Sequence, residues 1–475
     1  MKTAKRLIQA AVCILILVAA LPSYGTAQTA ISAAMIDTKA VDALIAEQVK
    51  TRGLVGVSVA IMQDGRIVLA KGYGVSSLPD RRPVSDETMF AIGSITKQFT
   101  SACVLLLAED GKLSVADKVA KYYPNLTRAG DITLLDLMNH VSGYPDYYPL
   151  DFVDRRMIKP IAPDELIRLY GTGKLDFEPG SRYSYSNTGY VLLGRVVEKV
   201  SGESFGAVLA RRILKPLGLE HTVYEPDPRD AGLARGFTTF VLSGPVPAEP
   251  EAKGWIAAAG AIYATASDLA KWDLALIDGK LLKPESFKLM TSPRKLSDGR
   301  TSNYGCGLAV SERAGLTVLS HNGAVAGFLA QNMMVPANRS ATVLLSNFDA
   351  SGDVGALYRQ VMATIFPKGP DVPKIAGPPA PEKAKELFLK LQEGAIDRSQ
   401  FGEEFNVFLT DEKIRGASER LKPYGAPTGA ALEGINERGG MEVTTVRLSF
   451  NSGSLRALMY RMPDGKVEQF FIYKD

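Results

Sequence analysis

The segment AIGSITKQF, residues 91–99, places Ser94 and Lys97 three positions apart, just after a glycine. A serine hydroxyl is a weak nucleophile unless a neighbouring base takes its proton. Positions i and i+3 of a helix lie on one face, so the side chain of Lys97 can reach the oxygen of Ser94. Lys97 could act as the base only if burial or a nearby cation lowered its pKa toward neutrality. By itself, however, Ser-x-x-Lys more often marks an ordinary, exposed first helical turn.

A second group of polar residues, YSYSN at 183–187, contains Tyr185 and Asn187 in a Tyr-x-Asn arrangement. A phenol can shuttle protons, and an amide can hold a substrate carbonyl or orient a lysine such as Lys97. Taken alone, the same residues describe a capped helix with a structural tyrosine.

A third group, His321-Asn322-Gly323, stands at the entry to a predicted strand. Glycine permits close backbone approach, so a substrate could lie along the strand edge. The backbone N–H of Ala324 could then join that of Ser94 as an oxyanion hole. A lone histidine before a turn is, however, more often structural.

Together and in this order, these motifs resemble those of the penicillin-binding-protein and serine β-lactamase superfamily, with His-x-Gly in place of Lys-Thr-Gly. The branch that they resemble most is the class C β-lactamase-like serine hydrolases. The resemblance runs from Gly53 to Phe366 and implies an α+β fold, in which an antiparallel sheet flanked by helices is joined to an all-helical subdomain. It includes further ordered segments: LMNHVSGYPD (137–146), FEPG (177–180), AG (259–260), ATASDL (264–269) and YGCG (304–307).

The resemblance implies roles for the matching residues. Ser94 would be the acylated nucleophile and Lys97 its base partner. Tyr185 would shuttle protons during acylation and activate water for deacylation, and Asn187 would bind the acyl side of the substrate. No metal or organic cofactor is implied, in agreement with a chain that has three histidines, no His-Glu-x-x-His motif and no Gly-Lys-Ser/Thr phosphate loop.

The resemblance places His321 and Gly323 on the opposite wall of the site, where the departure from Lys-Thr-Gly bears on the substrate. A lysine there would be a permanent cation for a substrate carboxylate, as in β-lactams and D-Ala-D-Ala peptides. His321, with an ordinary pKa of about 6.5, would be mostly neutral at pH 7, and Asn322 lacks the threonine hydroxyl. Strong β-lactam turnover is therefore not expected.

We expect a secreted serine hydrolase that cleaves a small-molecule ester, amide or peptide, of the esterase or D-amino-acid peptidase/amidase type. One alternative is a β-lactamase or D,D-carboxypeptidase. An alternative of another class is a penicillin-binding receptor or binding module without turnover. In a further alternative, the C-terminal domain carries the function and the hydrolase domain is only its scaffold. Specificity would depend on Tyr144, Tyr147, Tyr148 and the stretch 227–253, which is rich in Pro, Gly and charge and is expected to be a surface insertion.

Residues 1–27 have the order of a secretory signal peptide, with three basic residues, an apolar run over 7–21 and small residues before an expected cleavage after Ala27. The run is short of the roughly 20 residues that a membrane span needs, although an uncleaved anchor is the alternative. We therefore expect a periplasmic or extracellular protein with no integral span once the leader is removed. Because the leader holds three basic and no acidic residues, its removal lowers the net charge from +4 to +1, which gives no sign of a nucleic-acid partner.

The hydrolase domain is expected over residues 34–366. A hairpin over 56–70 around an Asp-Gly turn opens it, and strands at 316–320, 326–335 and 340–345 close it. Strands at both ends with helices between them predict an α+β domain whose terminal strands share one sheet. Cys103 and Cys306 could form a disulfide or remain buried thiols.

A proline-rich linker is expected over 367–381, followed by a small α+β domain over 382–475. Its helical pattern spans 382–421, and an antiparallel meander spans 441–473. This order weakly resembles a cystatin-like or NTF2-like domain, which suggests that the chain forms oligomers through it.

Overall fold

The computed structural model describes residues 36–148, 150, 153–227, 229–239, 243–313, 316–365, 374–438 and 440–474. The expected signal peptide, residue 366 at the end of the expected hydrolase domain and residues 367–373 of the expected linker lie outside this set. Among the described helices, none combines the length and the apolar character needed to cross a bilayer.

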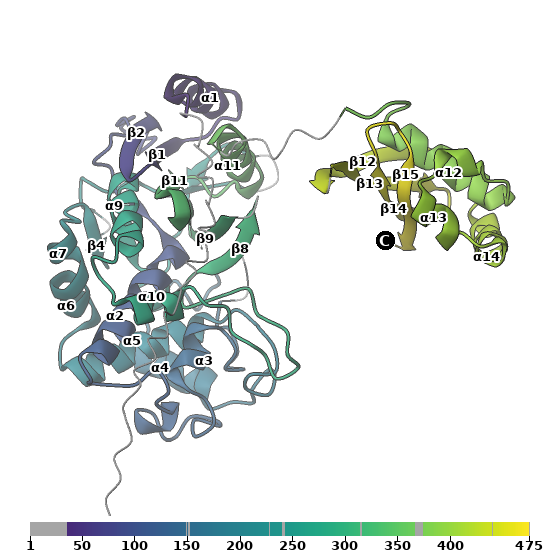
Figure 1. Ribbon diagram of the computed structural model, residues 1–475. Helices are drawn as coiled ribbons and strands as arrows, with labels where there is room; N and C mark the ends of the chain where they lie inside the picture. The colour runs from purple at the N-terminus through teal and green to yellow at the C-terminus, as the bar shows by residue number, and fades with distance from the viewer. Residues whose placement is uncertain are drawn as a thin grey trace, which may run out of the picture. The chain divides into compact units, whose positions relative to one another are not determined.

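The main domain is built on a six-stranded antiparallel sheet in the order β2-β1-β11-β10-β9-β8 (Figure 1). Its strands are β1 (Gly56–Gln63), β2 (Arg66–Gly74), β8 (Ala309–Arg313), β9 (Leu316–Val325), β10 (Phe328–Val335) and β11 (Ser340–Ser346). The predicted hairpin is confirmed, because Asp64 and Gly65 both have positive φ, as the two central residues of a type I′ turn require. Pairing of β1 with β11 joins the two ends of the domain in one sheet, as predicted.

Both faces of this sheet are covered by helices. Helix α9 (Ala266–Ile277) packs on β1 and β11, while α1 (Thr38–Thr51) and α11 (Ser351–Ile365) pack on β2 and β10. Strand β1 is buried along its whole length, and its side chains alternate between the two cores. A strand buried on both faces anchors the sheet against which the helical part of the domain is built.

The helical part surrounds α2 (Thr96–Glu109), which is buried along most of its length and packs against α5 (Asn187–Ser201) and α8 (Ala257–Gly260). Its other elements are the helices α3 (Leu134–Met138), α4 (Pro163–Gly171), α6 (Phe205–Leu209), α7 (Lys215–Leu217) and α10 (Pro284–Met290), and the π-helical segment Ala210–Leu214. A small sheet in the order β3-β7-β4 consists of β3 (Phe90–Ala91), β7 (Ile262–Ala264) and β4 (Thr222–Tyr224), and its β3 leads into the turn before α2.

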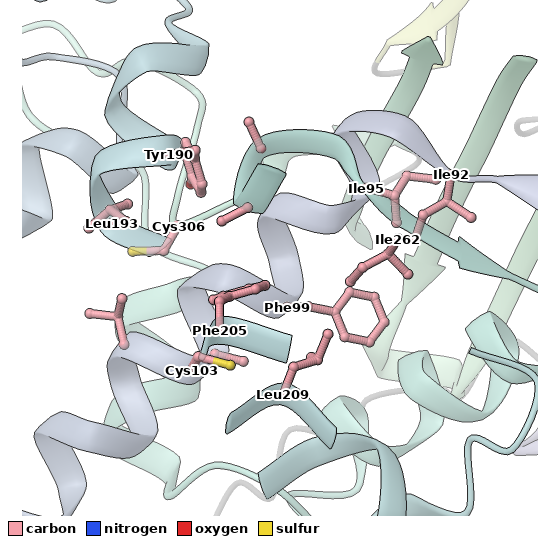
Figure 2. Close-up of a cluster of buried hydrophobic side chains, with 14 of the residues drawn as sticks. Ile92, Ile95, Phe99, Cys103, Tyr190, Leu193, Phe205, Leu209, Ile262 and Cys306 are labelled. Atoms are coloured by element: carbon pink, nitrogen blue, oxygen red, sulfur yellow. The ribbon is translucent and has the colours of Figure 1, made fainter. Parts of the chain in front are cut away.

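The core around α2 shows whether the two cysteines form a disulfide or remain buried thiols, the two alternatives that the sequence left open. Cys103 and Cys306 are free thiols buried among apolar side chains (Figure 2). Burial raises the pKa of each thiol to about 12, so neither is a reactive thiolate at neutral pH.

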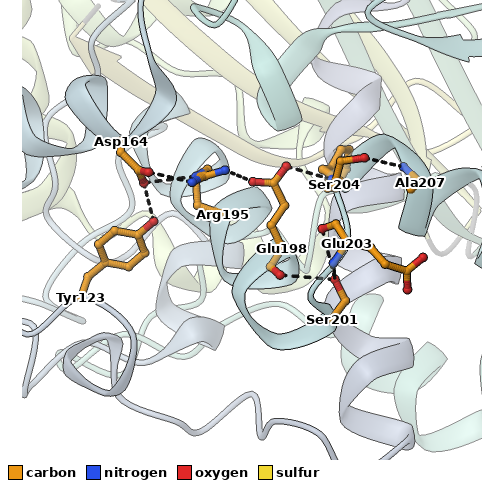
Figure 3. A network of polar contacts seen from close by, with 9 residues as sticks. Tyr123, Asp164, Arg195, Glu198, Ser201, Glu203, Ser204 and Ala207 are labelled. Carbon is orange, nitrogen blue, oxygen red and sulfur yellow. Dashed lines mark hydrogen bonds and ion pairs between the residues drawn. The ribbon is translucent and has the colours of Figure 1, made fainter.

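A network of polar contacts holds α4, α5 and α6 together (Figure 3). Asp164 of α4 accepts hydrogen bonds from Tyr123 and from Arg195 of α5, and Arg195 also pairs with Glu198. Glu198 in turn accepts the N–H of Phe205 at the start of α6 (2.9 Å). Partly exposed ion pairs of this kind are worth up to about 1 kcal/mol each, so their main effect is to fix the packing of these helices.

One expectation for the strands was wrong, and the expectation of a surface insertion holds in part, because most described residues of 227–253 are exposed or half-buried. His321-Asn-Gly323 does not separate two strands: it lies inside β9, and the turn comes at residues 326–327. The stretch 227–253 is partly built into the fold, with a two-stranded ribbon of β5 (Phe237–Thr238) and β6 (Val246–Pro247). Phe237 is buried there and its N–H donates to the carbonyl of Asn347, which ties the segment to the end of β11.

The C-terminal domain has its own apolar core between helices and a four-stranded antiparallel meander in the order β12-β13-β14-β15. The helices are α12 (Ala380–Glu393), α13 (Glu403–Phe408) and α14 (Asp411–Leu421), and the strands are β12 (Gly429–Arg438), β13 (Met441–Phe450), β14 (Gly453–Arg461) and β15 (Val467–Lys474). The prediction missed β12 and extended the linker into the first turn of α12.

A fully buried chain of hydrogen bonds joins α9, α2 and β10 behind the nucleophile helix. Trp272 donates to the side-chain oxygen of Gln98 (2.8 Å), Gln98 donates to Asn332 (2.9 Å), and Asn332 donates to Asp273 (2.6 Å). The second carboxyl oxygen of Asp273 has no hydrogen-bond partner among the described residues. Burial therefore raises the pKa of Asp273 well above its ordinary value.

We expect Asp273 to make the fold less stable as the pH rises. The unfolded carboxyl loses its proton near the ordinary pKa of about 3.9, whereas the buried one keeps it to higher pH, so the unfolded state is increasingly favoured above that value. Asp273→Asn cannot ionise and keeps an acceptor for Asn332. It should therefore unfold at a higher temperature than the wild type near neutral pH, by a margin that shrinks toward about pH 4.

Thermal unfolding followed by circular dichroism over this pH range measures the margin. Asp298→Asn serves as a control of opposite sign, because hydrogen bonds from Arg300 lower the pKa of the exposed Asp298. A margin for Asp273→Asn that does not vary with pH would contradict the prediction.

Candidate active site

Ser94 lies in the 3-10 turn Gly93–Ile95, which leads directly into α2. This turn passes close to β9. Gly93 has a φ of +50°, and a Cβ at this position would lie 2.8 Å from the backbone nitrogen of Ala324. Glycine at 93 therefore allows the nucleophile to stand at the junction of the sheet and the helical region.

Lys97 is fully buried, and its ammonium nitrogen contacts three acceptors. The distances are 3.0 Å to Ser94 Oγ, 2.7 Å to Asn187 Oδ1 and 2.8 Å to the carbonyl oxygen of Ala259. Burial lowers the pKa of Lys97 to about 7, against the opposing charge of Asp146. A large fraction of the side chain is therefore an uncharged amine near neutral pH.

The chemistry of the three partners decides where the lone pair of this amine points. The side-chain oxygen of Asn187 and the carbonyl of Ala259 can only accept, so they take the two N–H groups of the neutral amine. The Ser94 hydroxyl is the partner that can donate. Its proton can therefore pass directly to the nitrogen of Lys97.

Asn187 opens α5, and its amide is engaged on both sides. While Oδ1 accepts from Lys97, Nδ2 donates to Asp146 Oδ1 (3.1 Å), which also accepts the backbone N–H of Asn187 (3.1 Å). In this arrangement Asn187 orients Lys97, one of the two roles considered for it. Asp146 stands in the matching segment LMNHVSGYPD, yet nothing in its sequence context gave it a role, because its partner lies in a distant element.

Tyr185 lies beside Lys97, with its ring centroid 4.8 Å from the lysine nitrogen. Its hydroxyl is buried and has no hydrogen-bond partner among the described residues. Burial raises the pKa of Tyr185 well above its ordinary value, although the neighbouring Ser94 hydroxyl opposes this shift. The phenol is therefore neutral at rest and available as a proton donor.

The ring of Tyr185 is held by a second aromatic residue, His140. The two ring centroids are 4.2 Å apart, and His140 also packs against Tyr190 and Tyr304. Nδ1 of His140 accepts the N–H of Ser186 (3.1 Å), which fixes the backbone next to Tyr185. Burial keeps the pKa of His140 well below its ordinary value.

His321 is buried on β9, and both of its ring nitrogens are bonded. Nδ1 lies 2.5 Å from the carbonyl of Asn322, which can only accept, so Nδ1 carries the proton. Nε2 then accepts the hydroxyl of Tyr304 (2.7 Å). Burial and the charge of Lys97 lower the pKa of His321 to about 3, so His321 is uncharged at neutral pH.

Gly323 and Ala324 bring β9 against the nucleophile turn. A Cβ on Gly323 would lie 1.9 Å from the carbonyl oxygen of Ile92 and 3.1 Å from the nitrogen of Ser94, so only glycine fits. Val325 and Phe328 pair across a two-residue turn. Since hydrogen bonding alternates along an antiparallel pair, the N–H of Ala324 points away from β10, on the side where Ser94 lies. An oxyanion hole needs two such N–H groups on adjacent segments.

The structure thus brings together all the sequence-predicted site residues, which are Ser94, Lys97, Tyr185, Asn187, His321, Gly323 and Ala324. Two of the three tyrosines expected to shape specificity are instead structural. Tyr144 and Tyr147 are buried and donate to the backbone carbonyls of Thr127 and Trp255. Tyr148 is half-buried and donates to Glu251 (2.7 Å).

Comparison with known proteins gives one family and a consistent set of relatives. The family described as Beta-lactamase matches residues 41–364. Penicillin-binding protein 4* of Bacillus subtilis (strain 168) is 29% identical over 352 residues, which cover 70% of this chain and 76% of that protein. A D-aminopeptidase of Brucella suis biovar 1 is 28% identical over 357 residues, covering 73% of this chain and 68% of the peptidase.

Solved structures share the fold. The D-amino acid amidase from Ochrobactrum anthropi SV3 superposes with a TM-score of 0.58 at 25% identity, over 69% of this chain and 98% of the amidase. The octameric penicillin-binding protein homologue from Pyrococcus abyssi superposes with a TM-score of 0.61 at 22% identity, over 92% of this chain and 100% of that one.

The state of Lys97 predicts how the reactivity of Ser94 depends on pH. We expect labelling of Ser94 by a fluorophosphonate to speed up as the pH rises through about 7, because only the uncharged amine can take the serine proton. Lys97→Met should abolish this dependence and slow labelling by a factor of about 10² to 10⁴, the usual contribution of a general base.

Intact-protein mass spectrometry at a series of pH values gives the labelling rates of the wild type and of Lys97→Met, and so the pH dependence of each. Lys271→Met is the matched control, because Lys271 is half exposed and pairs with Asp268 away from the nucleophile. A wild-type labelling rate that stays constant across neutral pH would show that Lys97 is not the base.

Proposed function

The chain belongs to the beta-lactamase family of serine hydrolases, and we propose that it cleaves neutral esters, or amides and peptides of D-amino acids, through an acyl-enzyme on Ser94. One observation carries the proposal. The buried Lys97 has its pKa lowered to about 7 and contacts Ser94 Oγ at 3.0 Å while acceptors hold its remaining hydrogens.

In the proposed acylation, the Ser94 proton moves to Lys97 as Oγ attacks the substrate carbonyl. The carbonyl oxygen becomes an oxyanion that accepts hydrogen bonds from the N–H groups of Ser94 and Ala324. When the tetrahedral intermediate collapses, the leaving amine or alkoxide takes a proton from the Tyr185 phenol or from the Lys97 ammonium. The product is an ester between the acyl group and Ser94.

Deacylation reverses these steps with water in place of the leaving group. The water gives up a proton as it attacks the acyl ester, and Tyr185 with Lys97 receives it. As the bond between the acyl carbon and Oγ breaks, Lys97 gives a proton to Oγ, which releases the acid product and restores Ser94. Tyr185 suits this relay because its ring lies beside Lys97 and its hydroxyl neighbours that of Ser94.

The substrate class follows from the wall that contains His321. A β-lactam or a D-Ala-D-Ala peptide carries a carboxylate, which a permanent cation would bind. His321 is neutral and both of its nitrogens are engaged, so this wall favours substrates without a carboxylate near the scissile bond. Similarity to a D-aminopeptidase and to a D-amino acid amidase supports the same class.

Two further parts of the proposal concern location and assembly. The order of charged, apolar and small residues over 1–27 supports export to the periplasm or the extracellular space. We also propose that the C-terminal domain mediates self-association. An octameric homologue from Pyrococcus abyssi with the same fold over 92% of this chain supports that role.

A substrate panel tests the reaction. We expect p-nitrophenyl acetate and D-alanine p-nitroanilide to be turned over at least about tenfold more efficiently than nitrocefin or an N-acyl-D-Ala-D-Ala peptide, a difference of about 1.4 kcal/mol in barrier. Ser94→Ala should lose all of these activities, as well as fluorophosphonate labelling. A stable stoichiometric adduct without product release would instead identify a receptor, and preferential nitrocefin hydrolysis would identify a β-lactamase.

The charge of the His321 wall is tested separately. We expect His321→Lys to raise kcat/KM for carboxylate-bearing substrates relative to a neutral ester by roughly 10- to 100-fold, because a hydrogen bond to a charged group is worth about 1.5–3 kcal/mol. His321→Gln is the matched control, since it also loses the imidazole but adds no charge. If the two variants show the same ratio of kcat/KM between carboxylate-bearing substrates and the neutral ester, the charge at position 321 does not influence substrate preference.

A further inference from the structure

Asp146 lies beside the catalytic machinery without touching Lys97 or Ser94. Its Oδ1 accepts three hydrogen bonds at 3.1 Å, from the backbone N–H and the Nδ2 of Asn187 and from the N–H of Tyr148. Its Oδ2 lies 3.3 Å from the same Nδ2. The carboxylate thus binds both the first backbone N–H of α5 and the side chain of the same residue.

This contact decides which end of the Asn187 amide faces Lys97. The oxygen and the NH₂ group of an asparagine are nearly equal in shape, so a half-turn of the amide exchanges an acceptor for a donor. An ionised carboxylate can only accept. It therefore holds the NH₂ group on its own side and leaves Oδ1 facing Lys97.

The orientation matters for the direction of the lysine lone pair. With Oδ1 facing it, the neutral amine donates to Asn187 and Ala259 and keeps its lone pair for the Ser94 proton. With the amide turned round, the NH₂ group would donate to that lone pair and occupy it. Ser94 would then have no base.

We propose that Asp146 is a positioning residue, which fixes the amide of Asn187 so that the lone pair of Lys97 faces Ser94. This inference rests on the proposed function, because it concerns the proton transfer that forms the acyl-enzyme.

The negative charge of Asp146 has a second, measurable effect, which is on the pH at which Ser94 becomes reactive. The negative charge of Asp146 raises the pKa of Lys97, against the lowering by burial. The other titratable groups facing Lys97 are neutral at neutral pH, because burial lowers the pKa of His140 and His321 and raises that of Tyr185 and Tyr190. Removing the charge of Asp146 should therefore move the rise of Ser94 labelling to a pH below about 7.

Asp146→Asn is isosteric and keeps an oxygen for the backbone N–H groups of Asn187 and Tyr148, but it replaces Oδ2, which faces the NH₂ group of Asn187 at 3.3 Å, by a donor. Two NH₂ groups would then face each other, which disfavours the orientation of the Asn187 amide seen here. We expect Asp146→Asn to slow fluorophosphonate labelling of Ser94 at high pH by about 10- to 100-fold, which is part of the roughly 10²- to 10⁴-fold contribution of a positioned general base, and to shift the pH midpoint downward. Asp117→Asn is the matched control: Asp117 likewise accepts a backbone N–H, that of Ser114, but touches no site residue.

The exchange variant Asp146→Asn/Asn187→Asp provides the decisive comparison. The aspartate introduced at position 187 would again offer only an acceptor to Lys97, and the asparagine introduced at position 146 would donate to the other oxygen of that carboxylate. Labelling should recover relative to Asp146→Asn, but its pH midpoint should move upward, because a negative charge now contacts the lysine directly. A merely structural role for Asp146 would not move the midpoint in opposite directions in the two variants.

The possible outcomes divide cleanly. Wild-type labelling rate and pH midpoint in Asp146→Asn, with unchanged thermal stability, would overturn the inference and leave the proposed function intact. Failure of the exchange variant to label faster than Asp146→Asn, although both are folded by circular dichroism, would also overturn it. Absence of labelling in the wild type would instead remove the proposed function itself.

Discussion

The burial of the Lys97 amine is the constraint on which the rest of the site depends. An amine removed from water is tolerated only if it finds hydrogen-bond partners, and here these come from three separate elements: the turn before α2, the start of α5 and helix α8. The packing of α2 against α5 and α8 is therefore also the assembly of the catalytic centre. The same burial lowers the pKa of Lys97 to about 7 and so makes it a usable base.

The sheet contributes the opposite wall through close backbone approach. Gly93 and Gly323 leave no room for a Cβ, so the nucleophile turn and β9 meet backbone to backbone. Behind them, the buried contacts from Trp272 through Gln98 and Asn332 to Asp273 join α9, α2 and β10. The position of Ser94 is thus fixed from the sheet side and from the helical side.

Neutrality is the common electrostatic feature of the groups around Lys97. Burial disfavours the charged forms of His140, His321 and Tyr185, each of which could otherwise ionise. Asp146 is the charged group that acts on the lysine, and it does so from behind Asn187. A site of this kind suits the transfer of a proton between neutral groups better than the binding of an anionic substrate.

The sequence by itself determined the features that depend on spacing within one element or on local turn chemistry. The reach of Lys97 to Ser94 follows from i and i+3 on one helical turn, and the β1–β2 hairpin follows from its Asp-Gly turn. Only the tertiary structure decided that Cys103 and Cys306 remain apart, that His321 lies within β9 with both nitrogens bonded, and that Asp146 orients Asn187. The reason is physical: burial, pKa and hydrogen-bond partners are set by segments distant in the chain, whose contacts exist only once the sheet and helices have packed.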